Sequence, residues 1–115
     1  MKRKAMQREV AVLKRLSHPS VITMHDLIDT PKQVHLITDY VKGISLREYV
    51  RQKPNRMVRE VTARRMFKQI VEAVCYLHQI NVVHRDIKLD NILIEEGSRQ
   101  VKLIDFGFSV IVSPL

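Results

Sequence analysis

The first forty residues show two kinds of apolar spacing. Residues 4–16 carry apolar side chains three or four positions apart, which predicts an amphipathic helix that ends at the Ser-His-Pro segment 17–19. Two strand-like runs follow at 21–29 and 33–41, and the Thr-Pro-Lys segment between them predicts a β-hairpin. A lone two-stranded hairpin is marginally stable in water, so we expect further sheet beside it.

The second part of the chain repeats the change from helix to hairpin. The Ser-x-x-Glu pattern at 45–48 is a capping box that predicts a short helix, which ends at the Lys-Pro-Asn segment 53–55. Residues 58–78 carry the strongest helical pattern, and their apolar positions cover so much of the circumference that we expect neighbours on more than one side. Residues 91–96 and 99–106 predict a second hairpin, so the fold class is α+β.

Composition is that of a globular intracellular protein. The 115 residues are 45% hydrophobic, enough for a core. No run approaches the roughly 18 to 20 apolar residues of a membrane span, and the first residues have no signal-peptide apolar region. Cys75 is the single cysteine, so no intramolecular disulfide can form, and we expect it to be buried on a helix. We expect the cytoplasm as the location, with the nucleus left open.

Positive charge is concentrated in residues 42–68. The whole chain has a net charge of +8, and this segment holds nine Lys or Arg against Glu48 and Glu60, a local balance of +7. Such a segment attracts nucleic acid, anionic lipid or acidic protein, or it is simply a solvated helix face. Nucleic acid ranks low, because no aromatic residues interleave the charges to stack on bases.

Two short motifs carry the chemistry. Residues 84–91 read HRDIKLDN, and Asp105-Phe106-Gly107 follows the second hairpin. Either motif alone is a weak signal, but their order and their places on a loop and a hairpin match the catalytic loop and the DFG motif of protein kinases. The chain therefore resembles a eukaryotic protein kinase catalytic domain. Lys88 is typical of the serine/threonine type, and the nearest branch is the calmodulin-dependent and AMP-activated group.

The resemblance implies a role for each charged residue of the loop. Phosphoryl transfer requires a placed acceptor hydroxyl and neutralised phosphate charge. Asp86 would orient the hydroxyl of a Ser or Thr in a protein substrate and accept its proton, and Lys88 would contact the transferring phosphate. Asn91 and Asp105 would hold Mg²⁺. His84 would be mainly structural.

The resemblance also implies an ATP site. Glu9 is the candidate for the helix glutamate that pairs with the family's sheet lysine. Thr38 stands at the gatekeeper position, Asp39 to Val41 would offer backbone groups to adenine, and Leu93 matches the residue beneath the adenine ring. Lys14, in the sequence VAVLK, is not the phosphate-binding lysine, because it leads directly into His18-Pro19.

The implied architecture is a partial two-lobe kinase core. Residues 1–41 correspond to the family's C-helix, its fourth and fifth strands and the hinge. Residues 42–115 correspond to helices D and E, the catalytic loop, the seventh and eighth strands and the start of the activation segment. The sequence contains no Gly-rich phosphate loop, and no Ala-Pro-Glu motif follows the DFG motif. We therefore expect a kinase domain truncated at both ends, with Glu9 lacking its cation.

Two functional hypotheses remain open. The first is an ATP-dependent serine/threonine kinase fragment whose catalytic loop is intact but whose isolated activity is doubtful. The second is a non-catalytic, kinase-derived module that binds a partner through the basic segment 42–68 or through an exposed apolar face of helix 58–78. The second hypothesis predicts association through that helix.

Overall fold

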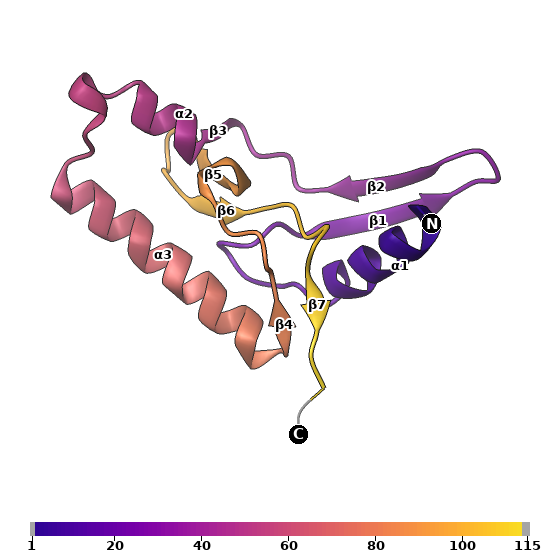
Figure 1. The fold of residues 1–115 in the computed structure, drawn as a ribbon. Helices are drawn as coiled ribbons and strands as arrows, with labels where there is room; N and C mark the ends of the chain where they lie inside the picture. Colours follow the sequence, from indigo (N-terminus) through magenta and orange to yellow (C-terminus); the bar gives the residue numbers. More distant parts are fainter. Residues whose placement is uncertain (1, 114–115) are drawn as a thin grey trace.

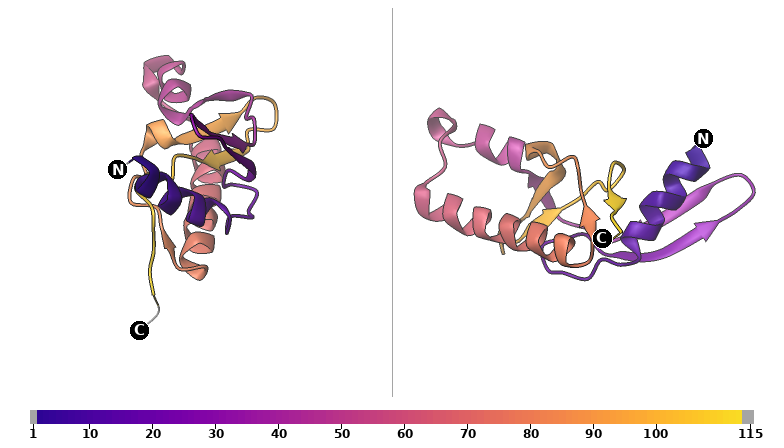
Figure 2. Two further views of the ribbon diagram at one scale, coloured as in Figure 1. Left: turned by 90° about the vertical axis from the view of Figure 1, so that its right-hand side faces the viewer. Right: turned by 60° about the horizontal axis from the view of Figure 1, so that its bottom comes forward.

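The computed structural model describes the backbone of residues 2–113 and the side chains of these residues except 2, 3 and 5. The molecule is elongated, with extents of 48 × 38 × 22 Å, and α1 and the β1–β2 hairpin lie at the opposite end from α2 and the start of α3 (Figures 1 and 2). The elements in chain order are α1 (Lys2–Leu13), β1 (Met24–Asp29), β2 (Val34–Thr38), β3 (Gly43–Ser45), α2 (Leu46–Arg51), η1 (Pro54–Arg56), α3 (Glu60–Gln79), β4 (Val82–Val83), η2 (Leu89–Asn91), β5 (Ile92–Glu95), β6 (Val101–Leu103) and β7 (Val110–Ile111).

The first predicted helix and hairpin are confirmed with shifted ends. Helix α1 ends at Leu13, because Arg15 and Leu16 donate their backbone N–H groups three residues back and tighten the last turn. Strands β1 and β2 are antiparallel, with a register shift between Met24 and Asp26. Val21 lies outside the hairpin and instead forms a parallel bridge to Leu103. The β1–β2 sheet itself has only two strands among the described residues, so the further sheet expected beside this hairpin is not found there.

The second predicted hairpin is confirmed, and it gains a strand that the sequence did not indicate. β5 and β6 pair antiparallel, and β3 pairs with the free edge of β5. The predicted connector at Gly43 is therefore a strand. A Cβ at Gly43 would lie 1.9 Å from the carbonyl oxygen of Ile94, so only glycine fits this approach. Ser45 caps α2, because its Oγ accepts the backbone N–H of Glu48 at 3.2 Å.

Helix α3 is fixed to the three-stranded sheet by its buried face and by one glutamine. Met66, Ala73 and Leu77 are its buried residues. The Gln69 side-chain oxygen accepts hydrogen bonds from Val101 N and from the Gln100 side chain, both at 2.8 Å. The buried core joins α1, α2, α3 and the strands through fourteen residues: Val12, Leu13, Leu16, Val21, Leu46, Met66, Ala73, Leu77, Val82, Ile92, Ile94, Val101, Leu103 and Phe106.

The outer face of α3 is open, as its sequence predicts. Phe67 and Val61 are about 60% exposed, and Val71 is also exposed. The prediction that Cys75 is buried is wrong, because the helix turns this residue to the exposed side. Among the described residues, no helix combines the length and the apolar character needed to cross a bilayer.

Candidate functional site

The loop of residues 84–91 lies between β4 and β5, and its two ends are held by different sheets (Figure 1). β4 pairs with β7, which follows the DFG motif, and β5 pairs with β6, which precedes it. The loop and the DFG segment are therefore clamped side by side at both ends. The sequence did not predict the β4–β7 pair, because each of its strands has two residues and no periodicity can mark so short a run.

Asp86 is the centre of the predicted catalytic residues. The Asn91 side-chain N–H₂ group donates to the Asp86 carbonyl oxygen and to Asp86 Oδ2, each at 2.9 Å. Lys88 Nζ lies 3.6 Å from Asp86 Oδ1. One carboxylate oxygen is thus held by a buried amide, whereas the other faces a half-exposed ammonium that can move. The structure brings these three predicted residues together.

His84 is structural, as expected. It is buried, its ring meets Phe106 edge-on at 4.7 Å, and its Nδ1 accepts the backbone N–H of Asp86 at 3.1 Å. Because a backbone N–H can only donate, the ring proton lies on Nε2, which donates to the Ile104 carbonyl oxygen at 2.8 Å. The imidazole therefore links the catalytic loop to the strand end that carries Asp105.

Asp105 follows β6 in an unusual backbone conformation. Its φ is 57°, in the left-handed region that non-glycine residues rarely adopt, and the same holds for Arg85 at φ 69°. Gly107 N donates to Asp105 Oδ1 at 3.2 Å, and Arg85 Nε donates to the Phe108 carbonyl oxygen at 2.7 Å. Strained residues of this kind are typical of functional sites, where surrounding contacts fix the backbone.

Glu9 faces the same region from α1. Burial of the carboxyl raises the pKa of Glu9, and the negative charge of Asp105 raises it further. Among the side chains that the structure describes, none forms a recorded ion pair with Glu9, and the predicted role of Glu9 stays a prediction.

Asp39 is clamped by three groups in the segment predicted to be the hinge. Its Oδ2 accepts Thr23 N at 3.1 Å and lies 3.6 Å from Lys102 Nζ, and its Oδ1 lies 2.6 Å from His25 Nε2. Burial acts to raise the pKa of Asp39, but the hydrogen bonds from His25 and Thr23 and the charge of Lys102 lower it overall. The carboxylate is held by the protein and is not free for a ligand.

The backbone of the same segment divides into bonded and free groups. Asp39 N donates to Thr23 O at 2.9 Å, and Thr38 Oγ1 donates to the Asp39 carbonyl oxygen at 3.3 Å. Within the part of the chain that the structure describes, the N–H and carbonyl groups of Val41 form no hydrogen bond. Leu93 pairs with Lys102 across β5 and β6, and Lys102 reaches Asp39, so two of the predicted adenine residues, Leu93 and Asp39, are linked through this strand pair.

The donor set fits a magnesium ion that is bound together with phosphates. Asn91 uses its amide nitrogen for Asp86, which leaves its amide oxygen for a cation. The backbone carbonyl oxygen of Asn91 accepts the backbone N–H of Ile104 at 3.0 Å. Asn91 is therefore bonded to the residue that precedes Asp105. Among residues 2–113 no group of three His, Cys, Asp or Glu side chains forms a metal cage. Mg²⁺ prefers one or two protein oxygens plus substrate phosphates, so two ligands suffice.

Sequence reasoning missed three residues that support the site. Lys102 and His25 hold the hinge carboxylate, and Gly43 allows β3 to approach β5. No motif marks Lys102 or His25, because their roles depend on the register of β1 and β6. For Gly43, the only indication in the sequence was a glycine in the connector between two predicted elements, where glycine permits a close approach of two backbones.

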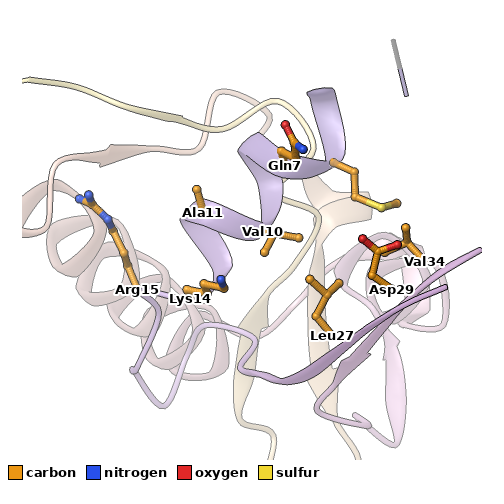
Figure 3. A pocket seen from close by; sticks show the side chains of 9 residues that line it. Gln7, Val10, Ala11, Lys14, Arg15, Leu27, Asp29 and Val34 are labelled. Atoms are coloured by element: carbon orange, nitrogen blue, oxygen red, sulfur yellow. The ribbon is translucent and has the colours of Figure 1, made fainter. Parts of the chain in front are cut away.

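The cavity of about 510 Å³ between α1 and the β1–β2 hairpin is separate from this site. Figure 3 shows Val10 and Leu27 facing each other across it, with Lys14 and Arg15 at one end and Asp29 at the other. Lys14 therefore lines a space on the hairpin side of α1.

The loop of residues 84–91 and the DFG segment lie together in the arrangement that is typical of the protein kinase fold. The sequence model of the protein kinase domain family matches residues 1–114, and the chain belongs to this family.

Three curated relatives illustrate the similarity. CBL-interacting protein kinase 25 of rice is 41% identical over 109 residues, which are 92% of this chain and 21% of that protein. SNF1-related protein kinase catalytic subunit alpha KIN12 of Arabidopsis thaliana is 36% identical over 90% of this chain and 20% of its own length. Probable serine/threonine-protein kinase HSL1 of Saccharomyces cerevisiae is 35% identical over 95% of this chain and 7% of its own length. The chain thus spans about a fifth or less of these relatives.

Proposed function

We propose that the protein transfers the γ-phosphate of ATP to serine or threonine hydroxyls of other proteins. The observation that carries the proposal is the carboxylate of Asp86, with one oxygen held by Asn91 at 2.9 Å and the other 3.6 Å from Lys88. The relative HSL1, a probable serine/threonine-protein kinase, supports serine or threonine as the acceptor.

In this proposal the two oxygens of Asp86 have different roles. Oδ2 is fixed by Asn91, so Oδ1 is the oxygen that receives the proton of the acceptor hydroxyl. The hydroxyl oxygen forms a bond to the γ-phosphorus, the bond from that phosphorus to the β–γ bridging oxygen breaks, and ADP leaves. Lys88 is half-exposed and can turn from Asp86 towards the transferring phosphate. Magnesium held by Asn91 and Asp105 neutralises phosphate charge when it is bound.

The nucleotide lies between the hinge and the β5–β6 hairpin in this proposal. The free N–H and carbonyl groups of Val41 contact the adenine edge, Leu93 lies beneath the ring, and Thr38 lies at the back. Asp39 acts through its backbone carbonyl, because its N–H and carboxylate are already bonded. Glu9 faces the phosphates. Residues 1–41 form the small-lobe side of the nucleotide site, and residues 42–115 form the large-lobe side. The proposed use of Mg-ATP supports the cytoplasm as the location.

The test measures binding and transfer separately in the same variants. Asp86→Asn should lower phosphate incorporation into a protein acceptor by about 10²-fold or more, while the Kd for Mg-ATP changes little. Asp105→Asn should weaken Mg-ATP binding and its dependence on magnesium. Asp26→Asn removes an exposed carboxylate on β1 and should change neither quantity. An Asp86→Asn protein as active as the wild type would refute the catalytic assignment.

The exposed face of α3 supports a second candidate, a non-catalytic interaction module. Phe67 is 59% exposed, and Val71, four residues further on, lies next to it on the same exposed face of this helix. If wild type and Asp86→Asn are equally inert in transfer, the module is favoured. Partner binding should then survive Asp86→Asn and fail in Phe67→Ser.

A further inference from the structure

A groove lined by apolar and basic side chains lies where α2, η1 and the start of α3 meet the β5–β6 turn. Its volume is about 440 Å³. Met57, Val58 and Tyr49 supply apolar surface, and Lys53, Arg59 and Arg99 supply positive charge. These six residues are called the basic groove below. None of the described residues that line it carries a carboxylate, and its charge comes from two segments more than thirty residues apart in sequence.

The two arginines of the basic groove are not neutralised by the protein. Within residues 2–113 the side chains of Arg59 and Arg99 form no ion pair. The nearest acids along the chain pair with other cations, since Glu60 Oε1 accepts Arg64 Nη2 at 2.7 Å and Glu96 Oε2 lies 3.8 Å from Lys42 Nζ. The groove therefore presents uncompensated positive charge beside apolar surface.

Helix-capping and backbone preferences do not explain why arginine occupies these two positions. Arg59 is the N-cap of α3 without a side-chain capping bond, and a cation at this end opposes the helix dipole. Arg99 has φ 59°, a left-handed conformation that suits Gly or Asn better. Residues that break a local rule without a compensating contact are expected where the residue serves a function.

We propose that the basic groove binds an acidic, extended peptide segment of a partner protein. Carboxylates of the segment pair with Arg59 and Arg99, and an apolar side chain packs on Met57, which is 71% exposed. A nucleic acid fits less well, because Lys53 Nζ lies 4.5 Å over the Tyr49 ring and covers the aromatic face on which a base would stack. This inference goes beyond phosphoryl transfer and does not depend on it.

The experiment measures fluorescence anisotropy of a labelled peptide of Glu and Asp residues with two leucines. The test variant is Arg59→Asn with Arg99→Asn, because asparagine is favoured both at an N-cap and at positive φ. The variant should melt no lower than the wild type and bind the peptide about tenfold or more weakly. The matched control is Arg65→Gln, which removes an exposed charge from α3 outside the groove and should change the Kd by less than about twofold.

Two further probes separate the peptide from other anions. Met57→Ser should weaken peptide binding several-fold, and polyglutamate without leucine should bind more weakly than the probe. Equal Kd values for the wild type and the double variant, or an equal loss in Arg65→Gln, would overturn the proposal. Polyglutamate as tight as the probe would mean general charge attraction, and a tighter single-stranded RNA would assign the groove to nucleic acid. Each of these results rejects the peptide site.

Discussion

Replacing Asn91 by aspartate tests how the catalytic carboxylate is held. Asn91 is 6% exposed, and its amide nitrogen donates to two oxygens of Asp86 at 2.9 Å. Asn91→Asp keeps the size and shape of the side chain but removes both donors. It then places a second carboxylate against Asp86 in a largely buried position.

Two terms set the magnitude of the effect. Each lost hydrogen bond removes about 0.5–1.5 kcal/mol of net stability. Two like charges about 4 Å apart repel by about 1 kcal/mol in water and about 4 kcal/mol at the effective dielectric near a protein surface. Asp86 is 22% exposed and Lys88 is near, so solvent and the ammonium reduce the repulsion. We expect the free energy of unfolding to fall by about 2–4 kcal/mol at neutral pH.

The pH dependence distinguishes repulsion from simple loss of packing. Urea unfolding followed by circular dichroism should show the full loss of unfolding free energy near pH 7.5. The loss should become smaller towards about pH 5, because a proton shared by the two carboxylates removes their repulsion and restores one hydrogen bond between them. The control Asn81→Asp makes the same chemical change at an exposed position with φ 63° and should cost less than about 0.5 kcal/mol. A pH-independent loss no larger than that of the control would refute the reasoning.

Three other changes have expected outcomes in the same unfolding assay. Gly43→Ala should lower the free energy of unfolding by at least about 2 kcal/mol, because the new Cβ meets Ile94 O at 1.9 Å, and a loss below about 0.5 kcal/mol would disprove this close approach. Glu9→Gln should stabilise the protein at neutral pH, because burial and the charge of Asp105 raise the pKa of Glu9. The ionised carboxylate therefore lowers the free energy of unfolding fully above that raised pKa and not at all below the ordinary value of 4.5. A difference in unfolding free energy between variant and wild type that stays constant from pH 7 to below 4.5 would contradict this cause. Tyr76→Phe should cost about 1–2 kcal/mol, because its hydroxyl bonds two backbone groups of the turn after α1, and no change would mean that water replaces those bonds.

The sequence predicted the elements whose side chains repeat regularly. Helix 58–78 is found at Glu60–Gln79, and both hairpins are present, because a period of 3.6 or 2 persists over enough residues to be recognised. The exposed face of α3 was predictable for the same reason. Cys75 was misjudged, since a single small residue on a broadly apolar helix has no pattern that fixes its side.

The supporting contacts of the site were not predictable in this way. The motifs at 84–91 and 105–107 identified the residues with chemistry, and the structure confirms that Asp86, Lys88 and Asn91 lie together. The clamp on Asp39 joins β1 to β6 across long sequence separations, so it follows from register and not from any local signal. The roles of Thr38, Val41 and Leu93 stay predictions.

Strand β6 and the residue after it explain how distant parts of the chain form one site. Lys102 reaches the hinge carboxylate, and Leu103 exchanges backbone hydrogen bonds of 2.8 and 3.0 Å with the segment after α1. Ile104 bonds both the catalytic-loop imidazole and Asn91, and Asp105 faces the acid on α1. Because four consecutive residues make these contacts, a shift of β6 by one residue would displace Asp39, the loop of residues 84–91 and Asp105 together. The position of this single strand therefore couples the predicted hinge to the predicted catalytic carboxylate.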